Sequence, residues 1–318
     1  MSEQPQQMQC MEVWGGSQLT AQSVQFGGLD AWVYSKPYGK AHAGGDVYYA
    51  SSCATGRISR LLLADVAGHG KAVAETAADL RTLMRRFVNR LDQAEFVRLL
   101  NQQFAALPRT GAFATAVVST FFEPSSRLTI CNAGHPRPLL YCATQRQWNF
   151  LGDNASIQRA APSNIPLGLF EGAEYEQFDV ELGPGDCLVT YTDALIEARV
   201  GDGEMLREEG VLEIVRALGD VPPDQLTEKL LAEIEARYPE GLAEDDVTVL
   251  VVRANGRKIR YSFAEKAHAI GRMMAALVRS VNPRAERPPL PDANLANIGG
   301  AIIPALGRRW RASKTAGA

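Results

Sequence analysis

Apolar and polar residues alternate in short runs along this chain, a pattern that is typical of β-strands. Such runs lie at residues 30–35, 45–53, 57–66, 113–122, 127–133 and 138–142, and again at 175–182, 187–193 and 244–253. Other stretches have apolar residues at the spacing of one helix face, and they cover 71–90, 93–106, 207–218 and 224–237. The strands come in hairpins and the helices in pairs. This order predicts an α+β fold with mostly antiparallel sheets rather than a doubly wound βαβ fold.

The two ends of the chain differ from this patterned region. Residues 1–23 are rich in Gln and polar, and we expect them to form an arm. Residues 254–318 contain 12 Lys or Arg against 3 Asp or Glu, in a chain whose net charge is −3. In this extension we expect a short strand at 257–263 and a helix at 265–281, followed by a Pro-rich linker and a flexible basic tail. The sequence therefore predicts one central domain, at 24–253, with an acidic body.

Composition excludes several classes of protein. Apolar residues make up 46% of the chain, enough for a buried core, but no uninterrupted apolar run is long enough to span a bilayer. The start of the chain lacks the layout of a secretion signal. The five cysteines are scattered and have no CxxC spacing, so we expect a cytoplasmic protein without a zinc site or a disulfide framework.

Aspartates recur where an apolar strand meets a turn. They are Asp46 in GGD, Asp65 in LADVAGHG, Asp193 in TYTDA, and Asp245 and Asp246 in EDDVT. The strands of the first two motifs are joined by the three-residue link ATG, which is typical of a hairpin. Antiparallel pairing would then place Asp46 and Asp65 at the same edge of a sheet. The sequence alone does not bring Asp193 or Asp245 to that edge.

Carboxylates that share one cleft repel one another unless cations neutralise them. Oxygen ligands without Cys or His favour Mg²⁺ or Mn²⁺ over zinc. A water bridging two such ions becomes a nucleophile at neutral pH, and the ions offset the charge of a transferring phosphoryl group. An aspartate beside a glycine is more often a simple turn residue, and this alternative stays open for each motif taken alone.

Taken in order, these motifs resemble those of the metal-dependent protein phosphatases (type 2C, PPM), in their bacterial SpoIIE-like branch. The matching stretches are GGDVYY, LLLADVAGHGKAVAE, FATAVVSTFFEPSSRLTICNAGHPRPLLY, IPLGL, LGPGDCLVTYTDALIEAR and DDVTVLVVR. Each motif is weak alone, but the ordered set over residues 24–253 is specific. The resemblance implies a four-layer α-β-β-α sandwich of two antiparallel sheets flanked by helices. It also implies two divalent cations, Mn²⁺ or Mg²⁺, at one edge.

The resemblance assigns a role to each acidic residue. Asp65 would bridge both ions, and the backbone carbonyl of Val66 would bind one of them. Asp193 and Asp245 would bind the second ion, and Asp46 would act directly or through bound water. The implied reaction is direct attack of a metal-bridging hydroxide on phosphoserine or phosphothreonine, with Asp65, Asp193 and Asp245 as the catalytic residues.

Some positions match less closely or have a less certain role. Asp246 belongs to the expected metal site, where we expect it to orient other groups. Ala194 stands where the family usually has glycine, and it would loosen the second metal if the backbone there needs a positive φ. For His69 an exposed turn residue is the favoured interpretation over a phosphate ligand. We expect His135 to be structural, in a hairpin turn.

The sequence thus predicts a cytoplasmic serine/threonine protein phosphatase. The resemblance suggests a phosphorylated regulatory protein as the substrate, such as an anti-sigma-factor antagonist. The alternative is a catalytically inactive PPM-like scaffold that binds partners. A regulatory partner or a second copy could bind the helices at 71–106, although the apolar stripe there is better explained by a core. We expect no nucleic-acid binding, and we do not favour contact of the basic tail with a membrane.

Overall fold

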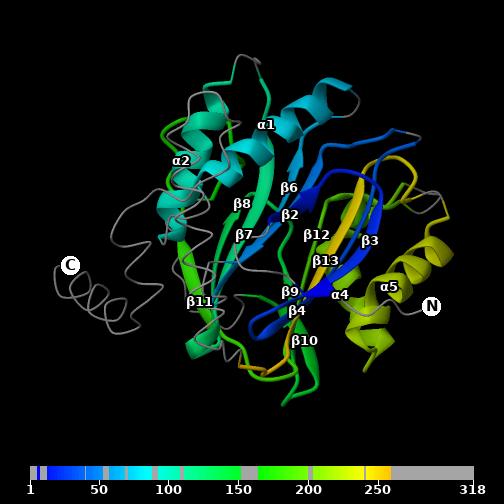
Figure 1. The fold of residues 1–318 in the computed structure, drawn as a ribbon. Helices are drawn as coiled ribbons and strands as arrows, with labels where there is room; N and C mark the ends of the chain where they lie inside the picture. Colours follow the sequence, from blue (N-terminus) through cyan, green and yellow to red (C-terminus); the bar gives the residue numbers. More distant parts are fainter. Residues whose placement is uncertain are drawn as a thin grey trace.

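Two β-sheets lie face to face in the computed structural model, and helices cover the outer face of each sheet (Figure 1). The structure describes residues 6–7, 13–39, 41–52, 57–68, 71–87, 92–107, 111–151, 164–199, 203–239 and 241–258. Within these ranges no helix has both the length and the apolar character that crossing a lipid bilayer requires.

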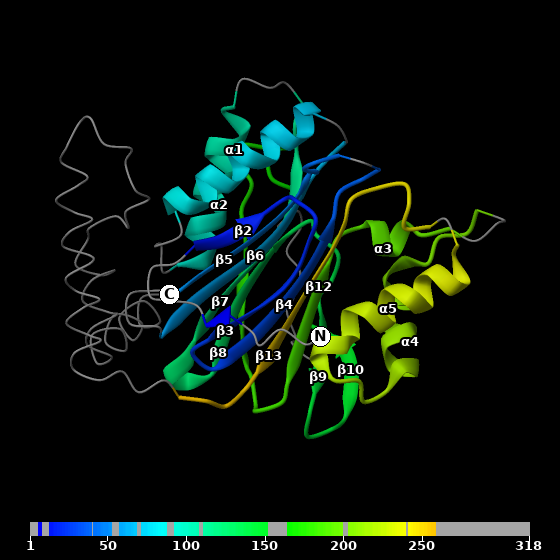
Figure 2. The same ribbon diagram turned by 45° about the vertical axis from the view of Figure 1, so that its right-hand side comes forward.

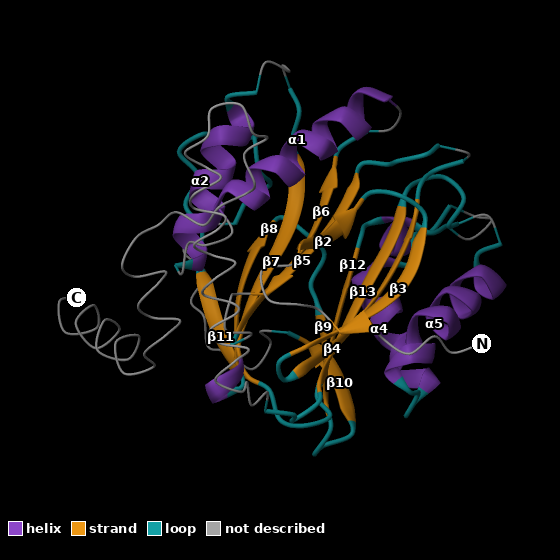
Figure 3. Ribbon diagram, in the orientation of Figure 1, coloured by secondary structure: helices purple, strands orange, loops and turns teal. Residues whose placement is uncertain are grey.

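The described strands form a seven-stranded sheet and a six-stranded sheet, shown in orange in Figure 3. The seven-stranded sheet has the order β1-β3-β4-β13-β12-β9-β10, with β1 (Gln6–Gln7), β3 (Thr20–Phe26), β4 (Leu29–Lys36), β9 (Leu139–Cys142), β10 (Gln147–Phe150), β12 (Cys187–Tyr191) and β13 (Val247–Ala254). The six-stranded sheet has the order β11-β8-β7-β6-β5-β2, with β2 (Val13–Gly16), β5 (Asp46–Ser52), β6 (Ile58–Val66), β7 (Ala114–Phe122), β8 (Arg127–Ala133) and β11 (Gln177–Glu181). Neighbouring strands are antiparallel, apart from the parallel pair β1–β3.

The helices form the two outer layers (Figures 1 and 2). They are α1 (Lys71–Phe87), α2 (Gln93–Ala105), α3 (Ala194–Glu197), α4 (Arg207–Leu218) and α5 (Pro223–Arg237), with a short 3-10 turn, η1 (Glu123–Ser125). Helices α1 and α2 pack on the six-stranded sheet, and α3, α4 and α5 pack on the seven-stranded sheet. A third apolar core fills the space between the sheets. The predicted four-layer α-β-β-α sandwich is confirmed.

Residues 61–64 of β6 form an uninterrupted apolar run because the strand is covered on both faces. Leu61 and Leu63 point into the core between the sheets, whereas Leu62 and Ala64 point toward α1 and α2. Successive side chains of a strand face opposite sides, so a strand that is covered on both sides needs apolar residues at every position. The run ends at Asp65, and Val66 after it is again buried against α1 and α2.

The predicted polar arm over residues 1–23 is wrong for residues 13–16 and 20–23, which lie in strands. Residues 13–16 form β2, which pairs with β5, and residues 20–26 form β3, which pairs with β4. The first four residues of β3 are exposed or half-buried. A strand with so little burial tolerates polar residues, which is why its composition resembles that of an arm.

Two connections that we expected to form hairpins join the sheets instead. Strand β11 lies in the six-stranded sheet and β12 in the seven-stranded sheet, so 175–182 and 187–193 do not pair. The turn that follows β8 likewise leads to β9 in the other sheet. Apolar alternation predicts a strand but not its partner, because the pattern is the same whichever sheet the strand joins. The pattern also did not predict β10 and α3.

Part of the predicted extension lies outside the described residues, which end at residue 258. The strand expected at 257–263 and the helix expected at 265–281 therefore stay predictions. Residues 152–163, between β10 and β11, also lie outside the described residues.

Candidate metal centre

Asp46 and Asp65 lie opposite each other on neighbouring strands. Asp46 is the first residue of β5, Asp65 is the next-to-last residue of β6, and the two are register partners in the antiparallel pair. Directly opposed residues of such a pair have side chains on the same face, with Cβ atoms about 4.5–5.5 Å apart. The prediction that both carboxylates stand at one edge of a sheet is confirmed.

Thr192 connects this edge to the seven-stranded sheet. Its Oγ1 donates a hydrogen bond of 2.9 Å to Asp46 Oδ2 and accepts one of 3.0 Å from the backbone N–H of Thr248. The N–H of Thr192 donates to the Thr248 carbonyl, also at 3.0 Å. Asp193 follows Thr192 directly in the chain. The ends of strands from both sheets therefore meet here, and Asp46 and Asp193 reach the same region from different sheets.

Asp246 holds the segment that leads into β5. Its Oδ1 accepts a hydrogen bond of 2.6 Å from the N–H of Tyr38, and its Oδ2 accepts one of 2.6 Å from the N–H of Gly45. A Cβ on Gly44 would come within 2.3 Å of this carboxylate, so only glycine lets the backbone approach so closely. Both oxygens of Asp246 thus already bind backbone groups, which supports the orienting role that we expected. Its own N–H donates to Asp245 Oδ1 at 2.8 Å.

The backbone around Val66 is shaped by glycines. A Cβ on Gly45 would come within 2.7 Å of the Val66 carbonyl oxygen, so this glycine keeps a side chain off that oxygen. Gly68 has a φ of +101°, a conformation that glycine adopts without strain, and the chain turns here directly after β6. These features fit the expected use of the Val66 carbonyl as a ligand. His69 lies outside the described residues, so its role stays a prediction.

The pKa values show that the carboxylates converge. Burial is the largest cause that raises the pKa of Asp65 from 3.8 to about 9. The charges of its acidic neighbours add to this shift, and those neighbours are Asp46, Asp193, Asp245 and Asp246. Burial also raises the pKa of Asp46 well above its ordinary value. It raises the pKa of Asp193 to about 6, with a further contribution from the charge of Asp245. Groups that shift one another in this way share one region.

The chemistry of this region fits hard divalent cations. All the side-chain donors are carboxylates, and Asp46 Oδ1 is buried without a hydrogen-bond partner among the described residues. Among the described residues, no three Asp, Glu, His or Cys side chains lie close enough together to hold one ion by themselves. Mg²⁺ usually keeps several waters and binds one or two carboxylates, so an incomplete set of protein ligands agrees with this type of ion.

Ala194 does not cause the strain that we considered. It is the first residue of α3, and it is not among the described residues with positive φ. The preceding residue, Asp193, has helical angles of −64° and −22°. A helical backbone accepts alanine as readily as glycine, so the departure from the family pattern leaves the position of Asp193 unaffected.

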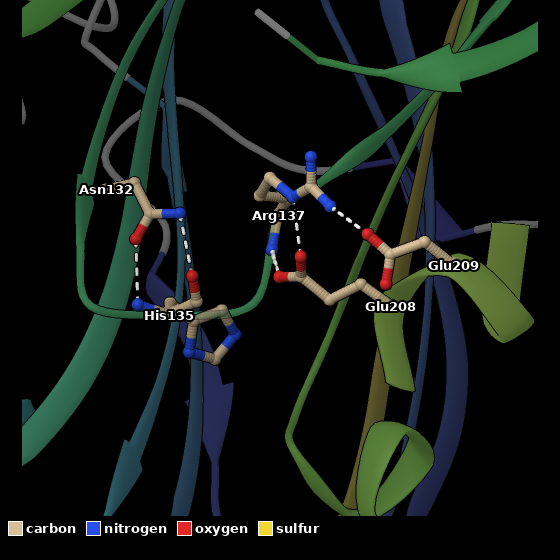
Figure 4. Close-up of polar contacts among 5 residues, drawn as sticks. All are labelled: Asn132, His135, Arg137, Glu208 and Glu209. Carbon is tan, nitrogen blue, oxygen red and sulfur yellow. Dashed lines mark hydrogen bonds and ion pairs between the residues drawn. The ribbon is translucent and has the colours of Figure 1, made fainter. Parts of the chain in front are cut away.

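His135 is structural, as expected, although its turn joins the two sheets (Figure 4). The side chain of Asn132 accepts from the N–H of His135 at 2.8 Å and donates to its carbonyl at 2.9 Å. Thr115, which pairs with Asp65 in the sheet, hydrogen-bonds His135 Nδ1 at 2.8 Å. Burial lowers the pKa of His135 to about 3, so the ring is neutral at neutral pH.

Arg137 secures the same turn to the outer helix layer, and sequence reasoning did not single it out. Its backbone N–H and its Nε donate to the two carboxylate oxygens of Glu208 at 2.7 and 2.5 Å, and Nη2 contacts Glu209 at 2.7 Å (Figure 4). Its guanidinium also lies 3.7 Å from the centre of the Phe150 ring. The link from β8 to β9 is therefore fixed to α4, which begins at Arg207.

Solved structures show that this is the fold of the PP2C-type phosphatases. The RsbU and RsbW domains of a Mycobacterium tuberculosis protein align over 83% of this chain and 76% of that one, with a TM-score of 0.59 and 21% identity. The PP2C phosphatase domain of SpoIIE from Bacillus subtilis, with a fragment of its regulatory domain, aligns over 77% of this chain and 64% of that one (TM-score 0.58, 17% identity). RsbX in complex with magnesium aligns over 74% of this chain and 99% of that one (TM-score 0.52, 18% identity).

The family follows from the sequence match. The family described as Stage II sporulation protein E (SpoIIE) matches residues 56–255. The chain therefore belongs to the SpoIIE family of PP2C-type serine/threonine protein phosphatases.

The raised pKa of Asp65 predicts how stability depends on pH in the absence of divalent cations. The folded protein keeps the Asp65 proton up to a pH of about 9, whereas the unfolded chain loses it near 3.8. Between these values the folded state binds more protons, so the free energy of unfolding falls as the pH rises, by at most about 1.4 kcal/mol per pH unit for one proton. Urea denaturation in a chelator, from pH 5 to pH 9, measures this slope.

Asp65→Asn is the matched control for that slope, because asparagine does not titrate. The variant should be less sensitive to pH than the wild type and, above neutral pH without cations, more stable. A wild-type stability that stays constant or increases over this pH range would contradict the pKa shift.

Thr192→Val tests the contact between the sheets. Valine has nearly the same shape, but it leaves both Asp46 Oδ2 and the N–H of Thr248 without the Thr192 hydroxyl. Buried groups that lose a partner cost about 1–3 kcal/mol, so the free energy of unfolding should fall by that amount in urea denaturation. Thr192→Ser keeps the hydroxyl and should stay close to the wild type. Equal stability of the valine and serine variants would show that the hydroxyl contributes nothing.

Proposed function

We propose that this chain is a metal-dependent phosphatase that hydrolyses phosphoserine or phosphothreonine on a regulatory protein. The observation that carries the proposal is the meeting of Asp46, Asp65 and Asp193 from two different sheets, with pKa values raised by burial and by one another's charge. Such a cluster is costly for the fold and is common at functional sites. Membership of the SpoIIE family supports the same activity.

The residues proposed to hold two divalent cations, Mn²⁺ or Mg²⁺, are Asp46, Asp65, Asp193, Asp245 and the carbonyl of Val66. The relative RsbX was solved in complex with magnesium, which supports this choice. When bound, such ions supply Lewis acidity: they make water a better nucleophile and offset the charge of the phosphoryl group.

The rest of the proposed mechanism lies in residues that position these groups. The hydroxyl of Thr192 fixes the orientation of the Asp46 carboxylate. Asp246 fixes the backbone of Tyr38 and Gly45, and so sets the start of β5. A residue that orients a ligand commonly matters for metal affinity, and we therefore assign Asp246 to positioning. We assign no catalytic role to His135, which stays neutral and supports the turn behind Thr115.

The proposed substrate is a phosphorylated regulatory protein of the anti-sigma-factor-antagonist type. One structural relative contains an RsbU domain together with an RsbW domain, which supports a partner of the regulatory kind. We further propose a cytoplasmic location, a catalytic unit over residues 24–253 together with β2 and β3, and a separate extension from residue 254. A regulatory partner or a second copy is proposed to act through α1 and α2.

Substitution of single carboxylates tests the activity. Asp65→Asn, Asp193→Asn and Asp245→Asn should each lower Mn²⁺-dependent hydrolysis of a phosphoserine peptide by at least about 100-fold. Loss of a residue that merely orients a metal ligand already lowers metal affinity or activity by about 10–100-fold. The measurement is phosphate release over time, with and without Mn²⁺.

Asp220→Asn is the control for these variants, because Asp220 is an exposed carboxylate in a surface ion pair with Arg146. It should retain the wild-type rate. A site variant that keeps its activity loses its proposed role. If the wild type releases no phosphate from the peptide or from an aryl phosphate at any Mn²⁺ concentration, the chain is the catalytically inactive scaffold instead.

A further inference from the structure

The six-stranded sheet ends in a strand with an open edge. Among the described residues, β11 pairs with β8 on one side, and no described strand pairs with its other side. The N–H and C=O groups along such an edge are a template for one more strand. Proteins normally cover an edge of this kind with another segment or protect it with charge.

The two faces of β11 differ in chemistry. Phe178 and Val180 are half-buried and pack against the core between the sheets. Asp179 and Glu181 are exposed on the opposite face, where Asp179 also contacts Arg127 and Thr129 of β8. A strand that completes this edge would therefore need apolar residues on one face and basic residues on the other.

The chain leaves its last described strand beside the C-terminal end of β11. The N–H of Gly185 donates to the carbonyl of Ala254 at 2.7 Å, and a Cβ on Gly256 would lie 3.3 Å from Pro184. Pro184 is only three residues beyond Glu181. Residues after Gly256 thus begin at the corner from which a segment can run back along β11, antiparallel to it.

A second observation places the end of the described chain, after β13, at the same corner. The positive charge of Lys258 acts on Glu123, whose carbonyl accepts from the N–H of Ser126 at 3.1 Å. The carbonyl of Ser126 in turn accepts from the N–H of Leu182, the residue after β11, at 2.8 Å. Figure 2 shows the orange end of β13 reaching the end of the molecule where β8 begins.

The first residues of the extension have the alternation that this edge requires. In RKIRYSF, residues 257–263, Ile259, Tyr261 and Phe263 alternate with Lys258, Arg260 and Ser262. We propose that residues 259–263, which follow the described Lys258, pair antiparallel with β11 as a seventh strand of the six-stranded sheet. This edge is thus an internal docking site for the start of the basic extension.

One register satisfies both faces together. In this register Asp179 lies opposite Arg260, a pair of opposite charge on the exposed face, beside Arg127, which already contacts Asp179 at 3.2 Å. On the other face Val180 meets Ile259 and Phe178 meets Tyr261, which would shield their half-buried side chains. Opposite-charge and apolar cross-strand pairs each contribute about 0.2–1 kcal/mol.

Amide hydrogen exchange on the full-length protein tests the pairing. Tyr261→Pro removes an N–H and disfavours a central strand position, but it lies outside the two sheets described here. In the wild type, the amides of residues 259–263 should exchange at least about tenfold more slowly than in this variant. A tenfold difference corresponds to about 1.4 kcal/mol of free energy for pairing of this segment with β11. Ala285→Pro, in the expected linker, is the control and should leave this protection intact. Equal exchange in the wild type and Tyr261→Pro would overturn the proposal.

A cross-link tests the register and the origin of the strand. Val180→Cys with Ile259→Cys should form a disulfide within one chain, since directly opposed residues lie within disulfide reach. Val180→Cys with Ser262→Cys is the matched control and should not, because that pair is offset by three residues and faces opposite sides. Peptide mapping identifies the bond. A disulfide between two chains, or equal yields for both pairs, would overturn the assignment.

Discussion

Burial of several carboxylates, together with their mutual repulsion, is the constraint on which the site depends. Asp46, Asp65 and Asp193 are held near one another at the edge where two sheets meet, and the fold keeps them there although burial and like charge disfavour their ionised forms. The arrangement is maintained by hydrogen bonds, above all by the Thr192 hydroxyl, which donates to Asp46 of β5 and accepts from the N–H of Thr248 in β13. Keeping these carboxylates together lowers stability and requires a rigid frame, and the four-layer sandwich provides that frame.

The frame is rigid at this edge because each layer is fixed by a different interaction. β6 is buried on both faces, between the sheet-to-sheet core and helices α1 and α2. The crossing from β8 to β9 is fixed by Asn132 and by the ion pairs of Arg137 with α4. The acidic residues therefore sit at the ends of elements whose positions are determined elsewhere in the molecule. This is how a strained cluster can persist without weakening the rest of the fold.

Local pattern was enough to predict an α+β fold with mostly antiparallel sheets and half of the site, whereas the four layers were implied by the family resemblance. Asp46 and Asp65 could be paired from the sequence because only a three-residue link separates their strands. Asp193 could not be placed in this way, since its strand pairs with β13 and β9, which are distant in the chain. For the same reason alternation suggested a false hairpin between β11 and β12. The contacts of Thr192 and Arg137 depend on three-dimensional packing that no local pattern contains.

The central claim is that burial and mutual repulsion raise the pKa values of these carboxylates until cations neutralise them, and proton release on metal binding tests it most directly. Without cations, Asp65 holds its proton up to a pH of about 9, so Mn²⁺ must displace it. Calorimetric titration near neutral pH, in buffers of different ionisation enthalpy, should show release of at least one proton per chain, because the pKa of Asp46 is raised as well, and less release as the pH approaches 9. Binding of Mn²⁺ without proton release, or equal release from Asp65→Asn, would contradict the account.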